Sequence, residues 1–215
     1  ASSPSGPLAI SSPTTIIARA RNGTAWSGPV SASFFPPQDV SALRLTEIHY
    51  HPEDQLDPFL DSAEFEFLEL KNTGSSPIDA TGLSFSSGIT FAFPPATIIP
   101  PGAFFLIARN PIAFSQRFPT ITPNGDFTDK LANSGESLTL SLAGSTVWSV
   151  SYSDSPPWRP EADGRGLSLQ RPIPTAPGSD PLTWTAASPS PGRDLDTADS
   201  DADGLPDYWE SLNGF

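Results

Sequence analysis

The stretch from 63 to 74 reads Ala-Glu-Phe-Glu-Phe-Leu-Glu-Leu-Lys-Asn-Thr-Gly, and it decides which class of fold the chain can adopt. Polar and apolar residues alternate from Glu64 to Phe67, and a denser apolar run follows up to Leu70. Alternation is typical of a strand with one solvent-facing side, and a dense run is typical of a strand near the centre of a sheet. Asn72 and Gly74 tolerate the backbone angles of a turn. The stretch therefore predicts a buried β-strand that begins at about residue 63 and ends at this turn.

A second strand with a similar pattern precedes it. Its apolar positions are Leu43, Leu45, Ile48 and Tyr50, and His51-Pro52 ends the run. Two such strands cannot bury a face on their own, so other strands must cover them. The pair therefore predicts an all-β sandwich whose second sheet comes from the rest of the chain.

Further strands and one helix are predicted by local pattern. Strands are expected, with turns between them, over residues 15–21, 30–35, 83–93 (as two short strands), 103–108, 138–142, 147–152, 167–170 and 183–186. Asn110 followed by Pro111 is a typical helix start, and Phe114 and Phe118 lie four residues apart on the same helix face. We expect these two rings to plug one end of the sandwich, and Trp184 to be pinned against it.

Composition and charge narrow the class of protein. The 215 residues carry a net charge of −13, which disfavours binding to nucleic-acid phosphates. No cysteine is present, so disulfides, thiolate zinc sites and cysteine nucleophiles are excluded. No apolar run approaches the roughly 20 residues needed to span a bilayer. The start at Ala1 and the lack of methionine are expected of a piece of a longer, multidomain chain.

An ordered series of segments resembles the lamin tail domain in its bacterial, secreted form. The series consists of 45–52 (Leu-Thr-Glu-Ile-His-Tyr-His-Pro), 66–74, 78–83, 91–94, 99–110 (Ile-Pro-Pro-Gly-Ala-Phe-Phe-Leu-Ile-Ala-Arg-Asn), 131–138, 152–158 and 163–171. The resemblance implies an immunoglobulin-like β-sandwich over residues 43–192, with one short helix and no catalytic apparatus of its own. It also implies an exported module at the cell surface or outside the cell.

Two smaller units flank this sandwich. Residues 14–27 resemble the last hairpin of the fibronectin-like modules that follow bacterial chitobiases, with Asn22-Gly23 at the turn. A lone hairpin is marginally stable in water, so the hairpin and linker over 1–38 should dock on the sandwich, be swapped between chains, or fray. We expect Ile16, Ala18, Ala20 and Phe34 to pack on the sandwich or on a neighbouring chain. Residues 193–215 form an acidic tail.

The acidic tail has the spacing of a calcium loop. Acidic residues occupy positions one, three, five, nine and twelve, and a glycine occupies position six, as in an EF-hand. The predicted ligands, with Leu205 acting through its carbonyl oxygen, are Asp199, Asp201, Asp203, Leu205, Asp207 and Glu210. The stretch also resembles the bacterial thrombospondin type 3 repeat, with Asp194 and Asp196 in a preceding partial repeat. A single, weak Ca²⁺ site is predicted; the alternative is a solvated acidic linker.

Other candidate ligands and catalytic groups are less convincing. Glu47, His49 and His51 share one face of a strand and could hold a transition metal, but we expect both histidines to face solvent. Glu66 and Glu69 lie an odd number of residues apart, so they should point to opposite faces of the sheet rather than act as a pair. The sequence therefore predicts no enzyme, although a hidden hydrolase using Glu66 or His49 stays an alternative.

The expected function is a non-catalytic structural, adhesion or targeting module with a calcium-stabilised C-terminal linker. Its partner, a protein or a glycan, is unknown from the sequence. One alternative is a carbohydrate-binding module that uses calcium and Trp158, although Trp158 and Trp26 are better explained as covers for the ends of the sandwich. Another is an accessory domain of a hydrolase or of a spore-coat-kinase-like protein.

Overall fold

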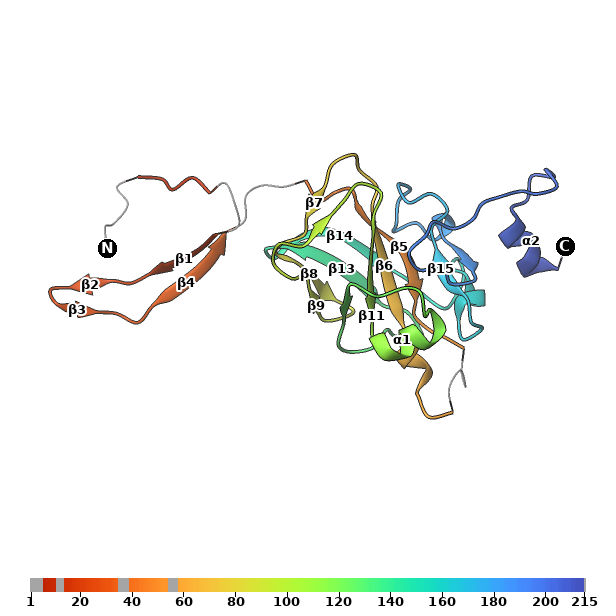
Figure 1. The fold of residues 1–215 in the computed structure, drawn as a ribbon, viewed down its shortest axis with the longest axis horizontal. Helices are drawn as coiled ribbons and strands as arrows, with labels where there is room; N and C mark the ends of the chain where they lie inside the picture. Colours follow the sequence, from red (N-terminus) through yellow and green to blue (C-terminus); the bar gives the residue numbers. More distant parts are fainter. Residues whose placement is uncertain (1–5, 11–13, 35–38, 54–57, 215) are drawn as a thin grey trace.

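Two β-sheets packed against each other form the centre of the structure (Figure 1). The computed structural model describes residues 6–10, 14–34, 39–53 and 58–214. The first sheet has six strands in the order β12 (Gly125–Asp126), β11 (Phe104–Ala108), β6 (Phe67–Asn72), β5 (Leu43–His49), β15 (Ser168–Gln170), β16 (Thr185–Ala187). The second has four, in the order β14 (Ser145–Ser151), β13 (Ser137–Leu142), β8 (Leu83–Ser87), β9 (Phe91–Ala92). This arrangement confirms the predicted all-β sandwich.

Short elements complete the sandwich. Strands β7 (Ile78–Asp79) and β10 (Ile98–Ile99) pair with each other. Three 3-10 helices lie in connections: η1 (Ser62–Phe65), η2 (Pro160–Ala162) and η3 (Pro181–Thr183). The α-helices of the described residues are α1 (Pro111–Arg117) and α2 (Asp207–Asn213), and neither is long and apolar enough to cross a membrane.

A bulge in β5 allows its apolar residues to share one face. Leu45 and Ile48 are an odd number of residues apart, yet both are buried in the core between the sheets. The pairing of β5 with β6 shifts register between Leu45 and Glu47, which inserts one extra residue into β5. The bulge therefore keeps the inward and outward faces of β5 consistent on both sides of Thr46.

The stretch from 63 to 74 forms a strand only in its second half. We predicted a strand from about residue 63, but the chain forms η1 there and β6 begins at Phe67. The Asp61 carboxylate accepts a hydrogen bond from the backbone N–H of Ala63, which caps this short helix. Phe65 is buried all the same. Local capping thus overrides the alternating pattern.

Helix α1 begins as predicted but covers a different surface. The Asn110 side chain accepts hydrogen bonds from the N–H groups of Ile112 (3.0 Å) and Ala113 (3.3 Å), and Pro111 is the first helical residue. Its Phe114 and Phe118 pack with Phe67, Leu106 and Ala108 in a cluster separate from the main core. All three partners lie on the outer face of the six-stranded sheet, so the phenylalanines cover a sheet face and do not plug the end of the sandwich.

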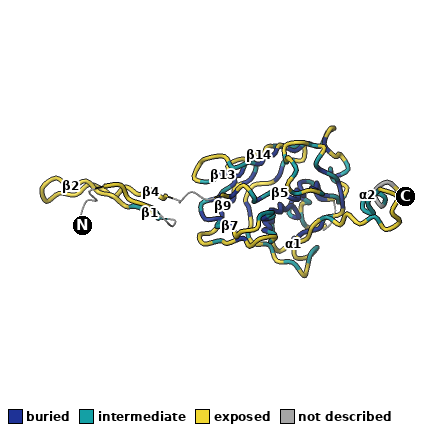
Figure 2. Tube along the Cα trace, turned by 90° about the horizontal axis from the view of Figure 1, so that it is seen from above, coloured by how far each residue is buried: buried dark blue, intermediate teal, exposed yellow. Residues whose placement is uncertain are grey.

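The N-terminal hairpin stands apart from the sandwich in both views (Figures 1 and 2). It consists of β1 (Thr14–Ala18) paired with β4 (Val30–Phe34), and of β2 (Arg21–Asn22) paired with β3 (Ala25–Trp26) at the tip. Gly23 has a φ of 60°, as the Asn-Gly turn predicts. All of β4 is exposed, so the expected packing on the sandwich is not observed in the described residues. Phe35, the predicted end of this strand, lies outside them.

Candidate functional site

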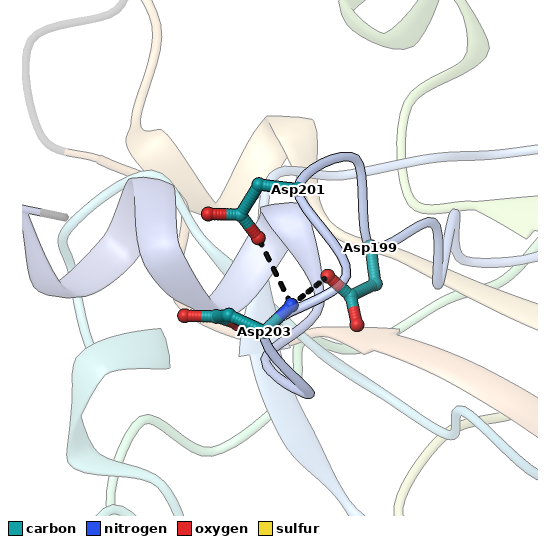
Figure 3. Close-up of side chains that lie close together, drawn as sticks. All are labelled: Asp199, Asp201 and Asp203. Atoms are coloured by element: carbon teal, nitrogen blue, oxygen red, sulfur yellow. Dashed lines mark hydrogen bonds between the residues drawn. The ribbon is translucent and has the colours of Figure 1, made fainter.

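The acidic loop connects the sandwich to α2 along the chain, and its first three aspartates converge (Figure 3). Asp199, Asp201 and Asp203 each offer a carboxylate oxygen, and these three oxygens lie within 4.8 Å of one another. The Asp203 N–H donates hydrogen bonds of 3.2 Å to both Asp199 Oδ1 and Asp201 Oδ1. The loop backbone therefore holds the first two carboxylates around the third residue.

Two residues with positive φ allow this tight curl. Ala202 has a φ of 60° and Gly204, at the sixth loop position, has a φ of 96°. The Gly204 N–H then donates to Asp199 Oδ2 (2.9 Å), and the Leu205 N–H donates to Asp203 Oδ1 (2.8 Å). Glycine adopts this backbone conformation without the steric cost of a Cβ atom, and the sharp turn of a calcium loop requires it at position six.

The two later acids are placed differently. Asp207 accepts hydrogen bonds from the Ser200 hydroxyl (2.6 Å) and the Ser200 N–H (2.7 Å), and these bonds lower the pKa of its carboxyl. The pKa of Glu210 is raised, first by desolvation and then by repulsion from the other loop acids, led by Asp201. The structure thus brings together Asp199, Asp201 and Asp203, while Asp207 and Glu210 stay outside that trio.

The donor set fits a hard cation. Two oxygens bound to the same Ca²⁺ at about 2.3–2.6 Å lie no more than about 5 Å apart, and the aspartate trio meets this limit. Carboxylate oxygens are the ligands that Ca²⁺ prefers, whereas transition metals favour nitrogen or sulfur. Desolvation and then repulsion from the other loop acids raise the pKa of Glu210, and a bound cation would relieve that repulsion.

The predicted solvent-facing histidines are covered. His49 has no exposed surface and packs on the Phe67 ring at 5.3 Å between centroids. Burial lowers its pKa to about 3, so the imidazole is neutral. His51 is half-buried, and its Nδ1 contacts the Asp163 carboxylate. Our expectation of exposure was wrong because α1 and later segments of the chain cover this face of the sheet, which β5 alone could not reveal.

Glu66 and Glu69, from the stretch 63–74, lie in different surroundings. Glu66 is buried, accepts a hydrogen bond from the Leu131 N–H (2.8 Å), and has its pKa raised to about 8 by burial. Glu69 accepts instead from Thr46 and from the Gly192 N–H on the outer face of the sheet. The two carboxylates therefore have different partners and do not form an acid–base pair.

The tryptophans also differ from one another. Trp158 is 7% exposed and packs against Trp184, with 5.9 Å between ring centroids, so its ring is covered, as the favoured explanation predicted. Trp184 is buried, as expected. Trp26 is half exposed on the hairpin, where the Arg21 guanidinium lies 5.3 Å from its ring, and so it does not cover the sandwich.

A cavity that the sequence did not predict lies between the acidic tail and the sandwich. Its volume is about 410 Å³, and it lies where α2 approaches β16. Its lining includes Arg159, Glu161, Ile173, Trp184, Tyr208 and Trp209. These residues are distant in sequence and share no local pattern, so no signal in the sequence identifies this cavity.

Comparison with known proteins supports the sandwich and leaves its flanks without a match. Searches of curated proteins and of solved structures gave no match. The sequence profile of the lamin tail domain matches residues 36–154, which include β5 to β14. The hairpin, the last two strands of the six-stranded sheet and the acidic loop lie outside the match. Because the match spans more than half of the chain and the structure is the sandwich that this family adopts, the chain belongs to the lamin tail domain family.

Proposed function

We propose that the protein is a non-catalytic structural, adhesion or targeting module of a large exported bacterial protein, with a C-terminal segment that calcium stabilises. Membership of the lamin tail domain family and the immunoglobulin-like sandwich are compatible with a structural module. The net charge of −13 disfavours a nucleic-acid partner and suits recruitment of divalent cations. The partner would be a protein or a glycan outside the cell or at its surface, and the module could accompany a hydrolase or a spore-coat-kinase-like domain.

The observation that carries the calcium part of the proposal is the convergence of Asp199, Asp201 and Asp203. Their spacing continues to Leu205, Asp207 and Glu210 in the pattern of a calcium loop. On binding, Glu210 would supply the bidentate carboxylate, and Asp207 would bind directly or through water. A single unpaired loop should bind with a Kd on the order of 0.1–1 mM, the range of extracellular modules.

Isothermal titration of the whole chain with CaCl₂ tests this proposal. We expect saturable binding to one site in the wild type and loss of that binding when Asp201→Ala is combined with Glu210→Ala. The fluorescence of Trp209, which lies between two of the proposed ligands, should change over the same range of calcium concentration. The matched control is Asp126→Asn, which removes an exposed carboxylate from β12 and should leave the titration unchanged.

Equal heats of calcium binding in the wild type and the double variant, or no heat in either, would contradict the assignment of these residues as calcium ligands. Carbohydrate binding through Trp158 receives no support, because Trp184 and the sandwich cover that ring.

A further inference from the structure

Residues 188–194, which we call the strap, cross the outer face of the six-stranded sheet on the way to the acidic loop. The Ser190 N–H donates to Glu47 Oε1 (3.1 Å), and the Gly192 N–H donates to Glu69 Oε2 (2.7 Å). At the end of the strap, the Asp194 carboxylate accepts hydrogen bonds of 2.5 Å from Lys71 Nζ. Two sheet carboxylates therefore hold the backbone of the strap directly.

The two carboxylates are direct neighbours in the sheet. Glu47 on β5 pairs with Glu69 on β6, and they are 1% and 2% exposed. Each also accepts a hydroxyl hydrogen bond, Glu47 from Ser168 (2.5 Å) and Glu69 from Thr46 (2.7 Å). Two carboxylates buried side by side resist full ionisation, since each loses hydration and repels the other.

The charges around the pair compensate it only in part. Arg193 attracts Glu47 and Asp194 repels Glu69, while the Lys71 ammonium is already paired with Asp194. Arg171 lines the same small pocket, but its guanidinium donates to the carbonyl oxygens of Leu45 and Ala176. His49, the next outward residue on β5, is neutral because it is buried.

We propose that Glu47 and Glu69 form a proton-dependent latch, which holds the strap while the pair keeps a proton and releases it when both carboxylates are ionised. Release would expose both side chains to water and detach residues 188–194 from the outer face of the sheet. The latch uses residues of the sandwich and the strap alone, so it does not depend on calcium binding at residues 199–210.

The expected direction with pH follows from proton linkage. In the latched state burial raises the pKa of Glu47 to about 7 and raises that of Glu69 well above its usual range. In the released state both carboxyls should titrate near the ordinary value of about 4.3. Between these values the latched state binds more protons, so attachment is strongest in acid and weakens about tenfold per pH unit for each proton retained. The contribution of Glu47 to this pH dependence of strap attachment ends above about pH 7.

Hydrogen exchange of residues 188–194 measures this opening. The protection factor, which corrects for the intrinsic pH dependence of exchange, would be followed from pH 5 to 8 in the presence of a chelator. In the wild type we expect it to fall by at least tenfold per pH unit up to pH 7, and by up to about a hundredfold where both carboxyls keep their protons in the latched state. Glu47→Gln combined with Glu69→Gln keeps the acceptor oxygens without the charges, so protection should not change with pH. Glu47→Gln alone and Glu69→Gln alone should each retain part of the pH dependence of the protection factor.

The matched control is Glu66→Gln, which neutralises another buried glutamate that does not contact the strap. It should keep the wild-type slope in the strap, and the amides of β13 should stay protected throughout. The latch is refuted if the wild-type strap shows no slope or if the double variant retains it. A slope lost equally in Glu66→Gln would also refute it, because global unfolding would then explain the effect. A failed calcium titration leaves these outcomes unaffected.

Discussion

Gly135 and Gly102 both adopt a positive φ, which L-residues rarely adopt, but they differ in the space around them. Gly135 has a φ of 105°, and a Cβ atom added there would lie 2.3 Å from the carbonyl oxygen of Tyr152 and 2.6 Å from Ser153 Cα. Gly102 also has a positive φ, 72°, but nothing lies within 4 Å of its added Cβ. An alanine at Gly102 would therefore suffer backbone strain alone, whereas an alanine at Gly135 would also collide with the neighbouring backbone.

We predict that Gly135→Ala destabilises the sandwich several times more than Gly102→Ala. Gly102→Ala should cost about 1–2 kcal/mol, the cost of placing an L-residue in the left-handed region. At Gly135 the backbone of Tyr152 and Ser153 must also move, and backbone atoms cannot swing aside as a flexible side chain can. Urea unfolding of the two variants measures the difference. Equal losses of unfolding free energy would show that the β14 end adjusts freely.

At the scale of elements, helix α1 depends on its N-cap residue, Asn110. The Asn110 carboxamide accepts hydrogen bonds from two N–H groups at the helix start and donates to Glu64 Oε2 (2.9 Å). These contacts fix the direction of the helix, and thereby place Phe114 on the outer face of the sheet. The cap thus connects a local sequence signal to the cover of β6 and β11.

Replacing Asn110 with Ala should reduce the free energy of unfolding by about 1 kcal/mol, the usual cost of losing an N-cap. For a domain of this size the melting temperature should fall by about 2–4 °C. Ser115→Ala is the control: Ser115 is exposed, its hydroxyl bonds only the Pro111 carbonyl, and alanine favours the helix. Thermal denaturation should leave this control unchanged or slightly more stable; a larger loss in it than in Asn110→Ala contradicts the role of the cap.

At the scale of the molecule, the sandwich carries its own core and the hairpin does not share it. The main cluster runs from Val40 to Ala186 and contains no hairpin residue. Ile17, Val30 and Phe34 are 67%, 72% and 45% exposed. The stability of the sandwich should therefore be independent of residues 1–38.

We accordingly predict that deletion of residues 1–38 changes the melting temperature of the sandwich by no more than about 1 °C, since the described hairpin residues, 14–34, are largely exposed and are not part of the core. Addition of a chelator should have as small an effect on the sandwich, because the aspartate trio lies outside the core. Calorimetry and the mass in solution test both points. A loss of several degrees, or a change in oligomeric mass on deletion, would show that the hairpin packs on the sandwich or on a second chain.

Signals in the sequence predicted what depends on neighbouring residues along the chain. The Asn110-Pro111 helix start, the Asn22-Gly23 turn and the strands at 104–108 and 137–142 all appear where local preferences place them. The spacing from Asp199 to Asp203 likewise brings three carboxylates together, because a tight loop with Gly204 leaves them few other arrangements. The strand predicted from residue 63 failed for a local reason too, the cap at Asp61.

Only the tertiary structure decided which side of each strand is covered. Alternation along β5 separates Glu47 and His49 from the core residues, but it does not state whether that outer side meets water. Here it meets the strap, whose Ser190 is 143 residues from its partner Glu47, and the helix that carries Phe114. Burial is set by whichever distant segment packs on a face, and the resulting desolvation raises the pKa of Glu47 and lowers that of His49. Such long-range contacts leave no periodic trace in the sequence, so the latch could be found only in the folded chain.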